Sequence, residues 1–450
     1  MTELLSGWGR TAPTAASLVH AAADPAEVRA AVLGAGPRGL VARGLGRSYG
    51  DAAQNGGGVV LRLDEGEGST ELGLDPVAQV ARVAAGVSLD SMIRRLLPQG
   101  FFVPVTPGTR FVTVGGAIAA DIHGKNHHVD GSFGRHVVSM TLVGADGESR
   151  EVTPDGDPEL FWATVGGMGL TGVIVSATVR VRPVSSAYVR VDTDRTGNLA
   201  ELVELMRRTD DGYTYSVAWI DLLARGGALG RSVLTRGEHA DVDELPDRAR
   251  RDPLAFAPRQ LLQAPAAVPS GLVNPWSVRA FNELWFRKAP HHRRAEIQGI
   301  GGFFHPLDGV GDWNRLYGRR GFVQYQVVVP PDADEALAEA VRRIADSGHA
   351  SFLAVLKRFG PGNEGLLSFP RAGWTLALDL PADPGLSPLL DRLDDLVVEA
   401  GGRTYLAKDS RTRPETLERM YPRLGEFRRL RRRIDPEGVF TSDLARRLGL

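Results

Sequence analysis

Apolar residues in the first 186 positions of the chain come in short runs separated by glycine-rich turns, a pattern that predicts short strands. Two short helices are predicted between these strands. One should begin at Asp24-Pro25 and end at Gly34, and the other should begin at Ser88, because Asp and Ser cap helix N-termini and glycine often follows a helix. The predicted strands are residues 59–63, 81–87 and 172–181, with a hairpin at 140–152.

Between residues 187 and 402 the pattern differs, because alternating strands are followed by longer periodic helices. From residue 322 the order is strand, helix, strand, strand, helix, which predicts an antiparallel sheet with helices on one face. Residues 258–276 are irregular and rich in proline, and mobile loops are predicted there. The other predicted elements are helices at 197–208, 332–347 and 387–402 and strands at 213–221, 322–330, 351–360 and 373–381.

Composition narrows the classes of function. The chain has 450 residues, of which 43% are hydrophobic and 24% charged, as in ordinary soluble proteins of two or three domains. A net charge of −1 gives no general attraction to nucleic acid, and the lack of cysteine excludes disulfides and thiolate catalysis. No apolar run reaches eighteen residues and the first residues lack a signal-peptide pattern, so we expect no spanning helix and no cleaved leader.

Two glycine-rich segments point to a bound cofactor. Residues 42–58 read ARGLGRSYGDAAQNGGG, and residues 107–128 read PGTRFVTVGGAIAADIHGKNHH. Glycine lets a backbone approach a ligand closely and turn its N–H groups toward anionic oxygens. A Rossmann glycine pattern should open a helix, whereas the first segment continues as a loop. We therefore predict that two loops, and no helix N-terminus, hold a diphosphate; the alternative is a glycine-rich loop with solvated histidines.

The histidines of the second segment allow another interpretation. His123, His127 and His128 are close enough in sequence to suggest a metal cluster. However, no nearby carboxylate or cysteine set completes such a cluster, and the spacing fits no standard zinc pattern. We therefore prefer a cofactor loop and predict no metal.

The predicted strands of the middle region place polar side chains on one face. Residues two apart in a strand share a face, so Gln324 lies with Gln326, Lys357 with Phe359, and Asp379 with Thr375 and Ala377. In the same way Trp219 pairs with Asp221. One interpretation is the floor of a polar substrate pocket. The alternative is a solvated face with a Lys357–Asp379 surface pair, which would contribute little stability.

Lysine is rare in this chain. Only Lys125, Lys288, Lys357 and Lys408 occur, and the remaining 49 of the 53 basic residues are arginine. A lysine kept in such a sequence suggests a need that arginine does not meet, such as a compact donor or a tunable pKa. Lys125, Lys357 and Lys408 lie in the segments GKNHH, KRFGP and YLAKDSR, whereas Lys288 is attributed to chance.

Four motifs together carry a resemblance to a known family. RGLGRSYGDAAQNGGG, the PGTR to GKNHH segment, ELFWATVGGMGLTG and YLAKDSR resemble flavoproteins of the vanillyl-alcohol oxidase type over nearly the whole chain. With FVQYQ and KRFGP added, the chain is similar to the actinobacterial oxidases of decaprenylphosphoryl-β-D-ribose. The resemblance implies an α+β, two-domain fold with an FAD-binding domain at 1–186, a substrate domain at 187–402 and a return to the FAD domain at 403–450.

The resemblance also implies site residues. It implies an essential lysine at Lys408, which either deprotonates the sugar hydroxyl or supports reduced flavin, with Tyr49 and His123 as further catalytic candidates. The cofactor-binding candidates are Ala42, Arg43, Gly44, Leu45, Gly46, Arg47, Ser48, Tyr49, Gly50, Asp51, Ala52, Gly108, Thr113, Val114, Gly115, Gly116, Ala120, Asp121, Ile122, His123, Ile174 and Tyr405. The substrate-binding candidates are Lys125, Trp219, Gln324, Gln326, Lys357, Phe359, Ala377 and Asp379.

Two departures from the family pattern change what is expected. Some relatives attach flavin through a histidine in the first glycine loop, where this chain has Ser48-Tyr49, so non-covalent FAD is predicted. Well-known members carry cysteine at the place of Ala377. Thiol-directed inhibitors would therefore find no target at that position in this chain.

The function implied is oxidation of the C2′ hydroxyl of a polyprenylphosphoryl ribose to the keto sugar, for cell-wall arabinan synthesis. A separate NADH- or NADPH-dependent reductase is the expected partner. The implied location is the cell envelope or periplasm, with the cytoplasmic face of the membrane as the second choice. Peripheral membrane contact through residues 258–290 is expected. The rivals are an alditol or aldonolactone oxidase of the same fold and a flavin-binding subunit without turnover.

Overall fold

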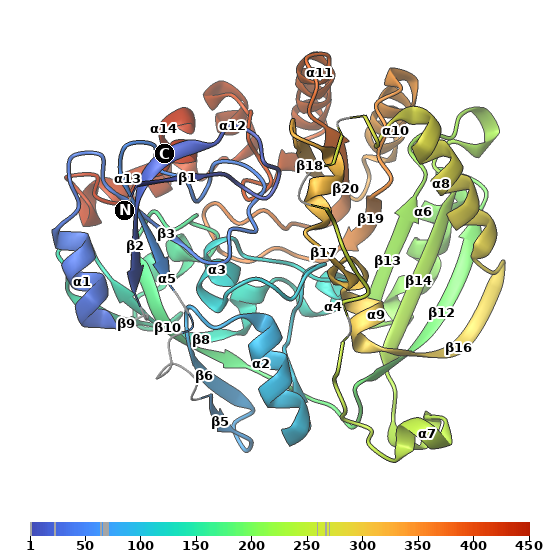
Figure 1. Ribbon diagram of the computed structural model, residues 1–450, viewed down its shortest axis with the longest axis horizontal. Helices are drawn as coiled ribbons and strands as arrows, with labels where there is room; N and C mark the ends of the chain where they lie inside the picture. The colour runs from blue at the N-terminus through green and yellow to red at the C-terminus, as the bar shows by residue number, and fades with distance from the viewer. Residues whose placement is uncertain are drawn as a thin grey trace.

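The chain folds into two lobes that lie side by side (Figure 1). The first lobe contains the N-terminal part and the C-terminal helices, and the second contains the middle of the chain. The computed structural model describes residues 2–21, 24–63, 65, 72–258, 260–265, 268–269 and 271–450. Within these ranges, no helix combines the length and the apolar character needed to cross a bilayer.

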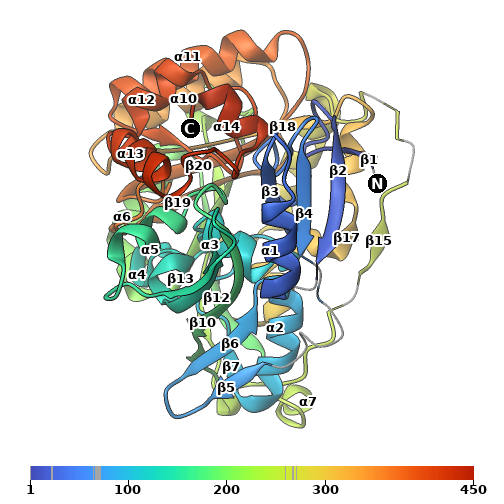
Figure 2. The ribbon, with the colours of Figure 1, turned by 90° about the vertical axis from the view of Figure 1, so that its left-hand side faces the viewer.

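Two sheets with helix α1 (Pro25–Leu33) between them form the first lobe (Figure 2). As predicted, the Asp24 side chain caps α1 and Gly34 follows its end. The four-stranded sheet has the order β1-β2-β4-β3, and the antiparallel five-stranded sheet has the order β5-β6-β10-β8-β9. Their strands are β1 Thr2–Leu5, β2 Thr14–Ala21, β3 Leu40–Arg43, β4 Val59–Leu63, β5 Gly73–Asp75, β6 Val80–Ala84, β8 Val137–Val143, β9 Ser149–Val152 and β10 Val173–Arg180.

The C-terminal segment returns to this lobe. Leu40 of β3 forms a bridge with Phe440, and Phe440 is buried in the core of the five-stranded sheet. The other helices of the lobe are α2 Leu89–Leu96, α3 Val114–Ala119, α4 His127–Asp130, α5 Pro158–Thr164, α12 Pro414–Met420, α13 Leu424–Ile434 and α14 Asp443–Leu448, and the short strands β7 Phe101–Phe102 and β11 Arg182–Pro183 pair with each other.

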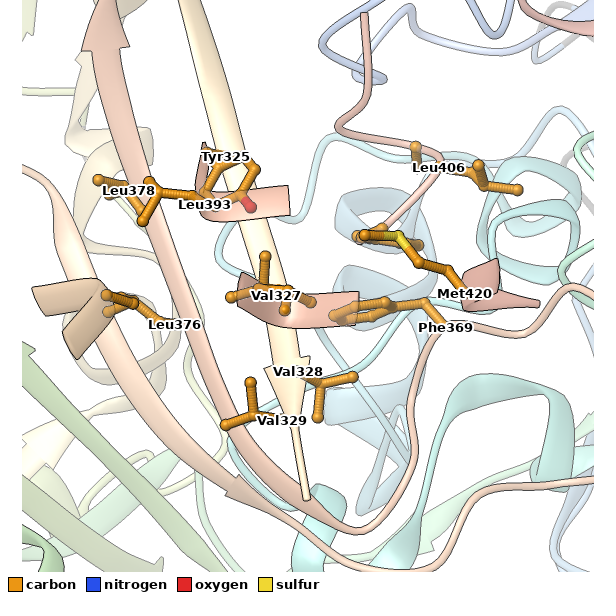
Figure 3. Close-up of a cluster of buried hydrophobic side chains, with 14 of the residues drawn as sticks. Tyr325, Val327, Val328, Val329, Phe369, Leu376, Leu378, Leu393, Leu406 and Met420 are labelled. Carbon is orange, nitrogen blue, oxygen red and sulfur yellow. The ribbon is translucent and has the colours of Figure 1, made fainter. Parts of the chain in front are cut away.

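The second lobe contains an antiparallel eight-stranded sheet in the order β16-β12-β14-β13-β19-β20-β18-β21. Three helices pack on one of its faces, as the sequence pattern predicts. Figure 3 shows Tyr325, Val327, Leu376 and Leu378 of the sheet in this core, with Leu393 of a covering helix. The strands are β12 Tyr188–Thr196, β13 Tyr215–Ile220, β14 Ser232–His239, β16 His292–Gly299, β18 Phe322–Val329, β19 Ala354–Phe359, β20 Gly373–Pro381 and β21 Arg403–Thr404; the helices are α6 Leu199–Thr209, α10 Asp334–Ser347 and α11 Leu386–Glu399.

The structure differs from the prediction of loops at 258–276 at the end of that stretch. The described residues before 275 are mostly irregular, but Pro275–Lys288 forms the 14-residue helix α8, and Asn274 caps it by accepting the N–H groups of Trp276 and Ser277. Pro275 at the first helical position has no N–H to lose, which is why this proline begins a helix. Residues 259, 266–267 and 270 lie outside the described residues. The remaining elements are β15 Leu262–Gln263, which pairs with β17 Val310–Gly311, and the helices α7 Asp247–Arg250 and α9 Ile300–Phe304.

Candidate active site

The first glycine-rich segment forms a loop after β3, as predicted. Gly46 adopts a left-handed conformation, with φ of 65°. Within the described residues, the backbone N–H groups of residues 45–48 have no protein acceptor. A run of free N–H groups around a left-handed residue forms a concave anion site. The residues of this loop therefore fit the diphosphate of a cofactor.

The second glycine-rich segment begins helix α3, which contradicts the prediction that both segments are loops. Thr113 caps the helix, and the N–H groups of Val114 and Gly115 donate to carbonyl oxygens of Val87 and Ala85. Small residues allow this start, because a Cβ on Gly115 would lie 2.9 Å from that of Ala85. The first N–H groups of α3 thus have protein partners, whereas those of residues 45–48 in the first loop do not.

The two segments touch each other. A Cβ on Gly44 would lie 2.2 Å from Thr113 Oγ1, so only glycine permits this contact. In contrast, a Cβ on Gly108 would meet nothing within 4 Å. Gly108 is exposed, so its backbone is accessible to a ligand.

Several cofactor-binding candidates have other roles in the structure. The buried Asp121 carboxylate accepts hydrogen bonds from Ser132, Asn363, Ser368 and the Gly134 N–H. Its carboxylate is thus occupied in holding loops together. Similarly, the carboxylate of Asp51 binds Arg447 of α14, and the guanidinium of Arg43 donates to the carbonyl oxygens of Ser6 and Ala53. The remaining candidates with buried side chains in the apolar cores are Ala52, Val114, Ile122 and Ile174.

The register of the eight-stranded sheet places the substrate-binding candidates on one face. Gln324 lies opposite Asp379, Gln326 opposite Ala377, and Lys357 opposite Thr375. This face is opposite to the one that the helices cover, because side chains alternate along a strand. Val355 links Ala377 to Trp219 across β19, so Trp219 belongs to the same face. Asp221 does not, because it lies beyond β13 and its carboxylate binds Arg231 and Asn282.

Hydrogen bonds order the polar face. Gln324 Nε2 donates to Asp379 Oδ1 over 2.5 Å, and Gln326 Nε2 lies 2.8 Å from His123 Nε2. Burial, and then Lys357, hold the pKa of His123 well below its usual value, so the ring is neutral and accepts this hydrogen bond. The strand face and the second glycine-rich segment therefore meet through this hydrogen bond and through Phe359, whose ring contacts the ring of His123.

Lys408 reaches this face from the C-terminal segment. Its Nζ lies 3.7 Å from the centroid of the Tyr49 ring. The chain segments meet there, because the Tyr49 N–H donates to the Ala407 carbonyl oxygen and Tyr405 donates its hydroxyl proton to the Ala120 carbonyl oxygen. A small cavity borders Lys408, and Gln324, Gln326 and Tyr405 also line it. All three catalytic candidates thus lie around the polar face.

Burial shifts the ionisation of several groups in this region. Removal from water lowers the pKa of Lys408, although the Asp379 carboxylate acts in the opposite sense. Burial likewise raises the pKa of Asp379, whose Oδ2 has no hydrogen-bond partner within the described residues. Burial alone lowers the pKa of Lys357 to about 8. These groups can therefore exchange protons near neutral pH, which ordinary surface lysines cannot.

Lys125 lies at the edge of the region. Its Nζ donates to the Phe303 carbonyl oxygen over 2.5 Å and lies 4.0 Å from the Phe303 ring centroid. Burial, and then the positive charge of Lys357, lower its pKa to about 7. Two lysines thus share a poorly hydrated space, a setting that favours an anionic ligand because an unmatched buried cation is costly.

The three clustered histidines do not converge. The His127 ring contacts that of Phe359 in a tilted arrangement, with 4.3 Å between the ring centroids, and His128 Nε2 lies within hydrogen-bond distance of the carbonyl oxygens of Asp210 and Tyr213. Across the described ranges, no group of three His, Asp or Glu side chains is arranged to hold a metal ion.

Sequence reasoning missed Trp8, and it placed Thr375 on the polar face without naming it a substrate-binding candidate. Thr375 Oγ1 accepts from Gln326 and lies opposite Lys357, so strand periodicity had already grouped it with the residues that it meets. Trp8 stacks on the Arg47 guanidinium at 3.8 Å from the ring centroid. No sequence signal connects Trp8 with Arg47, because their contact exists only after folding.

Known proteins match this chain at several levels. A family model described as "FAD binding domain" matches residues 16–153, and one described as "D-arabinono-1,4-lactone oxidase" matches residues 382–448. Decaprenylphosphoryl-beta-D-ribose oxidase of Mycolicibacterium smegmatis is 50% identical, over 100% of this chain and 98% of that protein. Alditol oxidase of a Streptomyces species is 26% identical, over 100% and 99%. The structure of Physcomitrella patens BBE-like 1 superposes with a TM-score of 0.65 at 17% identity, covering 95% of this chain and 90% of that one.

Proposed function

The chain belongs to the decaprenylphosphoryl-β-D-ribose oxidase family, and from this membership we propose that it oxidises the C2′ hydroxyl of decaprenylphosphoryl-β-D-ribose to the keto sugar. It is an FAD-dependent oxidoreductase acting on a CH–OH group. The observation that carries the assignment to this site is the position of Lys408. It lies over the Tyr49 ring, borders the same cavity as Gln324, and is close enough to Asp379 for that carboxylate to raise its pKa.

The cofactor fits the first lobe. The free N–H groups of residues 45–48 and the open backbone at Gly108 would hold it. FAD, when bound, supplies the acceptor for the hydride that leaves the sugar carbon. Tyr49 stands where a linking histidine would be needed, and its ring lies under Lys408, so we propose that FAD is bound without a covalent link.

The chain's own residues handle the proton and the orientation of the sugar. A neutral Lys408 amine accepts the hydroxyl proton, and burial, by lowering the pKa of this lysine, makes the neutral form accessible. Gln324, Gln326 and Asp379 offer donors and acceptors to a sugar ring, which fixes one hydroxyl toward Lys408.

The two other buried lysines favour a phosphorylated substrate. Lys357 has no hydrogen-bond partner within the described residues, and Lys125 has a single carbonyl partner. A phosphate diester would pair with such a cation, whereas a free pentose or alditol would leave it unmatched in a poorly hydrated space. This requirement supports the lipid-linked sugar over the alditol and aldonolactone alternatives.

The product of this oxidation is a keto sugar, and reaching the epimeric arabinose requires a reductant that this chain does not supply. We therefore propose a separate NADH- or NADPH-dependent reductase as the partner, and the cell envelope as the place of action.

Anaerobic reduction of the bound flavin tests the assignment directly. A polyprenylphosphoryl ribose, including one with a shortened tail, should bleach the flavin rapidly, while ribose, xylitol and sorbitol should act slowly. Rapid bleaching by alditols or gulonolactone, with none by the lipid-linked ribose, would assign the chain to the rival oxidases. No bleaching by any of these would indicate a flavin-binding subunit.

A further inference from the structure

Helix α8 carries an apolar surface that the protein does not cover. Trp276 is 78% exposed, Leu284 75%, Trp285 45% and Phe281 44%. More than half of the exposed large hydrophobic side chains in the described residues lie between positions 261 and 285, although this stretch is a small part of the chain. Scattered exposed apolar residues are ordinary, whereas a concentration of this kind marks an interaction site. We call Trp276, Phe281, Leu284 and Trp285 the α8 surface.

The helix is attached to the protein through its buried side chains and through the Glu283 carboxylate, which pairs with Arg231 at 2.7 Å. Val278 and Asn282, one turn apart, are its buried side chains, and Asn282 Nδ2 donates to Asp221 Oδ1 over 2.7 Å. In Figure 1, α8 lies on the outside of the second lobe. This attachment fixes the orientation of the helix, so the packing of the fold directs the α8 surface outward.

Positive charge accompanies the apolar residues. Arg279, Arg287 and Lys288 are exposed on the same helix, against the single carboxylate of Glu283, which leaves a net charge of +2. Arg279 lies 5.8 Å from the Trp276 ring centroid. Tryptophan beside arginine and lysine on a helix lying across a surface is the composition of an interfacial helix, whose rings enter the headgroup region while its cations meet anionic lipids.

A row of aromatic rings connects this surface with the site. From Phe281 the ring contacts run to Phe352 at 5.9 Å, to Tyr317 at 5.8 Å and to Phe322 at 4.2 Å. Phe322 then meets Tyr49 at 5.5 Å, and Tyr49 lies under Lys408. Tyr317 and Phe322 are buried, so these rings form one packed apolar cluster between the α8 surface and the site.

We propose that the α8 surface seats the enzyme on an anionic lipid bilayer. The apolar cluster connects the α8 surface with the site, and the proposal rests on the function proposed above: an enzyme held at the bilayer meets a substrate whose apolar tail stays in the lipid. An anionic bilayer satisfies both properties of the helix, since it buries the apolar side chains and attracts the cations.

Vesicle binding tests the proposal without turnover. The full chain with its cofactor should co-sediment with vesicles of equal parts phosphatidylglycerol and phosphatidylcholine, and weakly with phosphatidylcholine alone. A triple variant, Trp276→Ser, Leu284→Ser and Trp285→Ser, should bind at least tenfold more weakly. The control is Leu4→Ser with Leu33→Ser, which removes side chains of 72% and 57% exposure elsewhere and should bind as the parent does.

A second measurement separates this proposal from the oxidase assignment. Oxidation of a short-tailed, water-soluble substrate should be unchanged in the triple variant, and Leu284→Ser alone should show reduced vesicle binding if the triple variant folds poorly. Absence of vesicle binding by the parent protein would overturn the bilayer contact while leaving the oxidase function standing. A dimer that the triple variant abolishes would assign the surface to a second copy instead.

Discussion

The ammonium nitrogen of Lys408 lies 3.7 Å from the centroid of the Tyr49 ring, so a cation of the C-terminal segment rests on the first glycine-rich loop. The two segments are packed closely beside this contact, because a Cβ on Gly50 would lie 1.8 Å from the Asp409 carbonyl oxygen. Residues nearly 360 positions apart thus form one wall of the site. The ring also limits where the amine can go.

Replacing Lys408 tests its role as the proton acceptor. Lys408→Ala should reduce kcat by about 10²- to 10⁴-fold, the usual contribution of a positioned acid or base. Lys408→Arg should be similarly poor, because arginine stays protonated. The measurement is steady-state turnover with a parallel melting curve. A folded Lys408→Ala enzyme with unchanged kcat would remove Lys408 from the mechanism.

The pH dependence of turnover should report the Lys408–Asp379 pair. Activity needs the neutral amine, so kcat/KM should rise with pH through the lowered pKa of Lys408. The Asp379 carboxylate raises this pKa, and Asp379→Asn removes that charge. The rising limb of the variant should therefore shift to lower pH, whatever its maximal rate. A limb that stays in place, or moves to higher pH, would show that the two groups do not interact.

Lys357 should lower the free energy of unfolding of the protein. Burial lowers its pKa from 10.5 unfolded to about 8 folded, so the unfolded chain binds more protons between these values, and stability rises with pH across that window. Below about pH 8 the penalty is fully present. Lys357→Met should therefore melt higher than the parent at pH 7, with an advantage that declines toward pH 10, and should oxidise the phosphorylated substrate less efficiently. If the melting temperatures of Lys357→Met and the parent differed by the same amount at every pH, the lowered pKa of Lys357 would not be the cause of the difference.

Glycine at position 50 should be required for the joint between the loop and the C-terminal segment. Gly50→Ala would place a methyl group against the backbone carbonyl of Asp409, and backbone cannot rotate away as a side chain can. We expect a loss of at least about 2 kcal/mol in the free energy of unfolding. Gly36→Ala is the matched control, since a Cβ there meets nothing within 4 Å and should change stability little.

Acid precipitation can distinguish covalent from non-covalent attachment of FAD. With Tyr49 in place of a linking histidine, acid precipitation of the purified protein should leave the yellow colour in the supernatant. Dialysis against high salt at low pH should then yield apoprotein that regains activity on addition of FAD. Colour that stays with the precipitated protein would demonstrate a covalent bond formed by another residue.

The sequence by itself determined the local structure and the polar strand face. Strand periodicity sets which side chains share a face, so the grouping of Gln324 with Gln326, and of Ala377 with Asp379, followed from spacing alone. Capping residues such as Asp24 and Ser88 fixed where helices begin, because their hydrogen bonds involve neighbours in the chain. The FAD family was likewise readable from the glycine-rich motifs, since their residues are contiguous.

Tertiary structure decided which of these local features meet. Lys408 reaches Tyr49, and Gln326 reaches His123, only because the sheet of one lobe and the loops of the other are brought together by contacts between distant residues. Contacts between distant residues also explain why some candidates do not belong to the predicted site. The Asp121 carboxylate accepts four hydrogen bonds within the protein, and the first N–H groups of α3 donate to carbonyl oxygens. Burial also set the ionisation of Lys357 and Lys408, because a pKa depends on the water that neighbouring elements exclude, and no spacing along the chain records that exclusion.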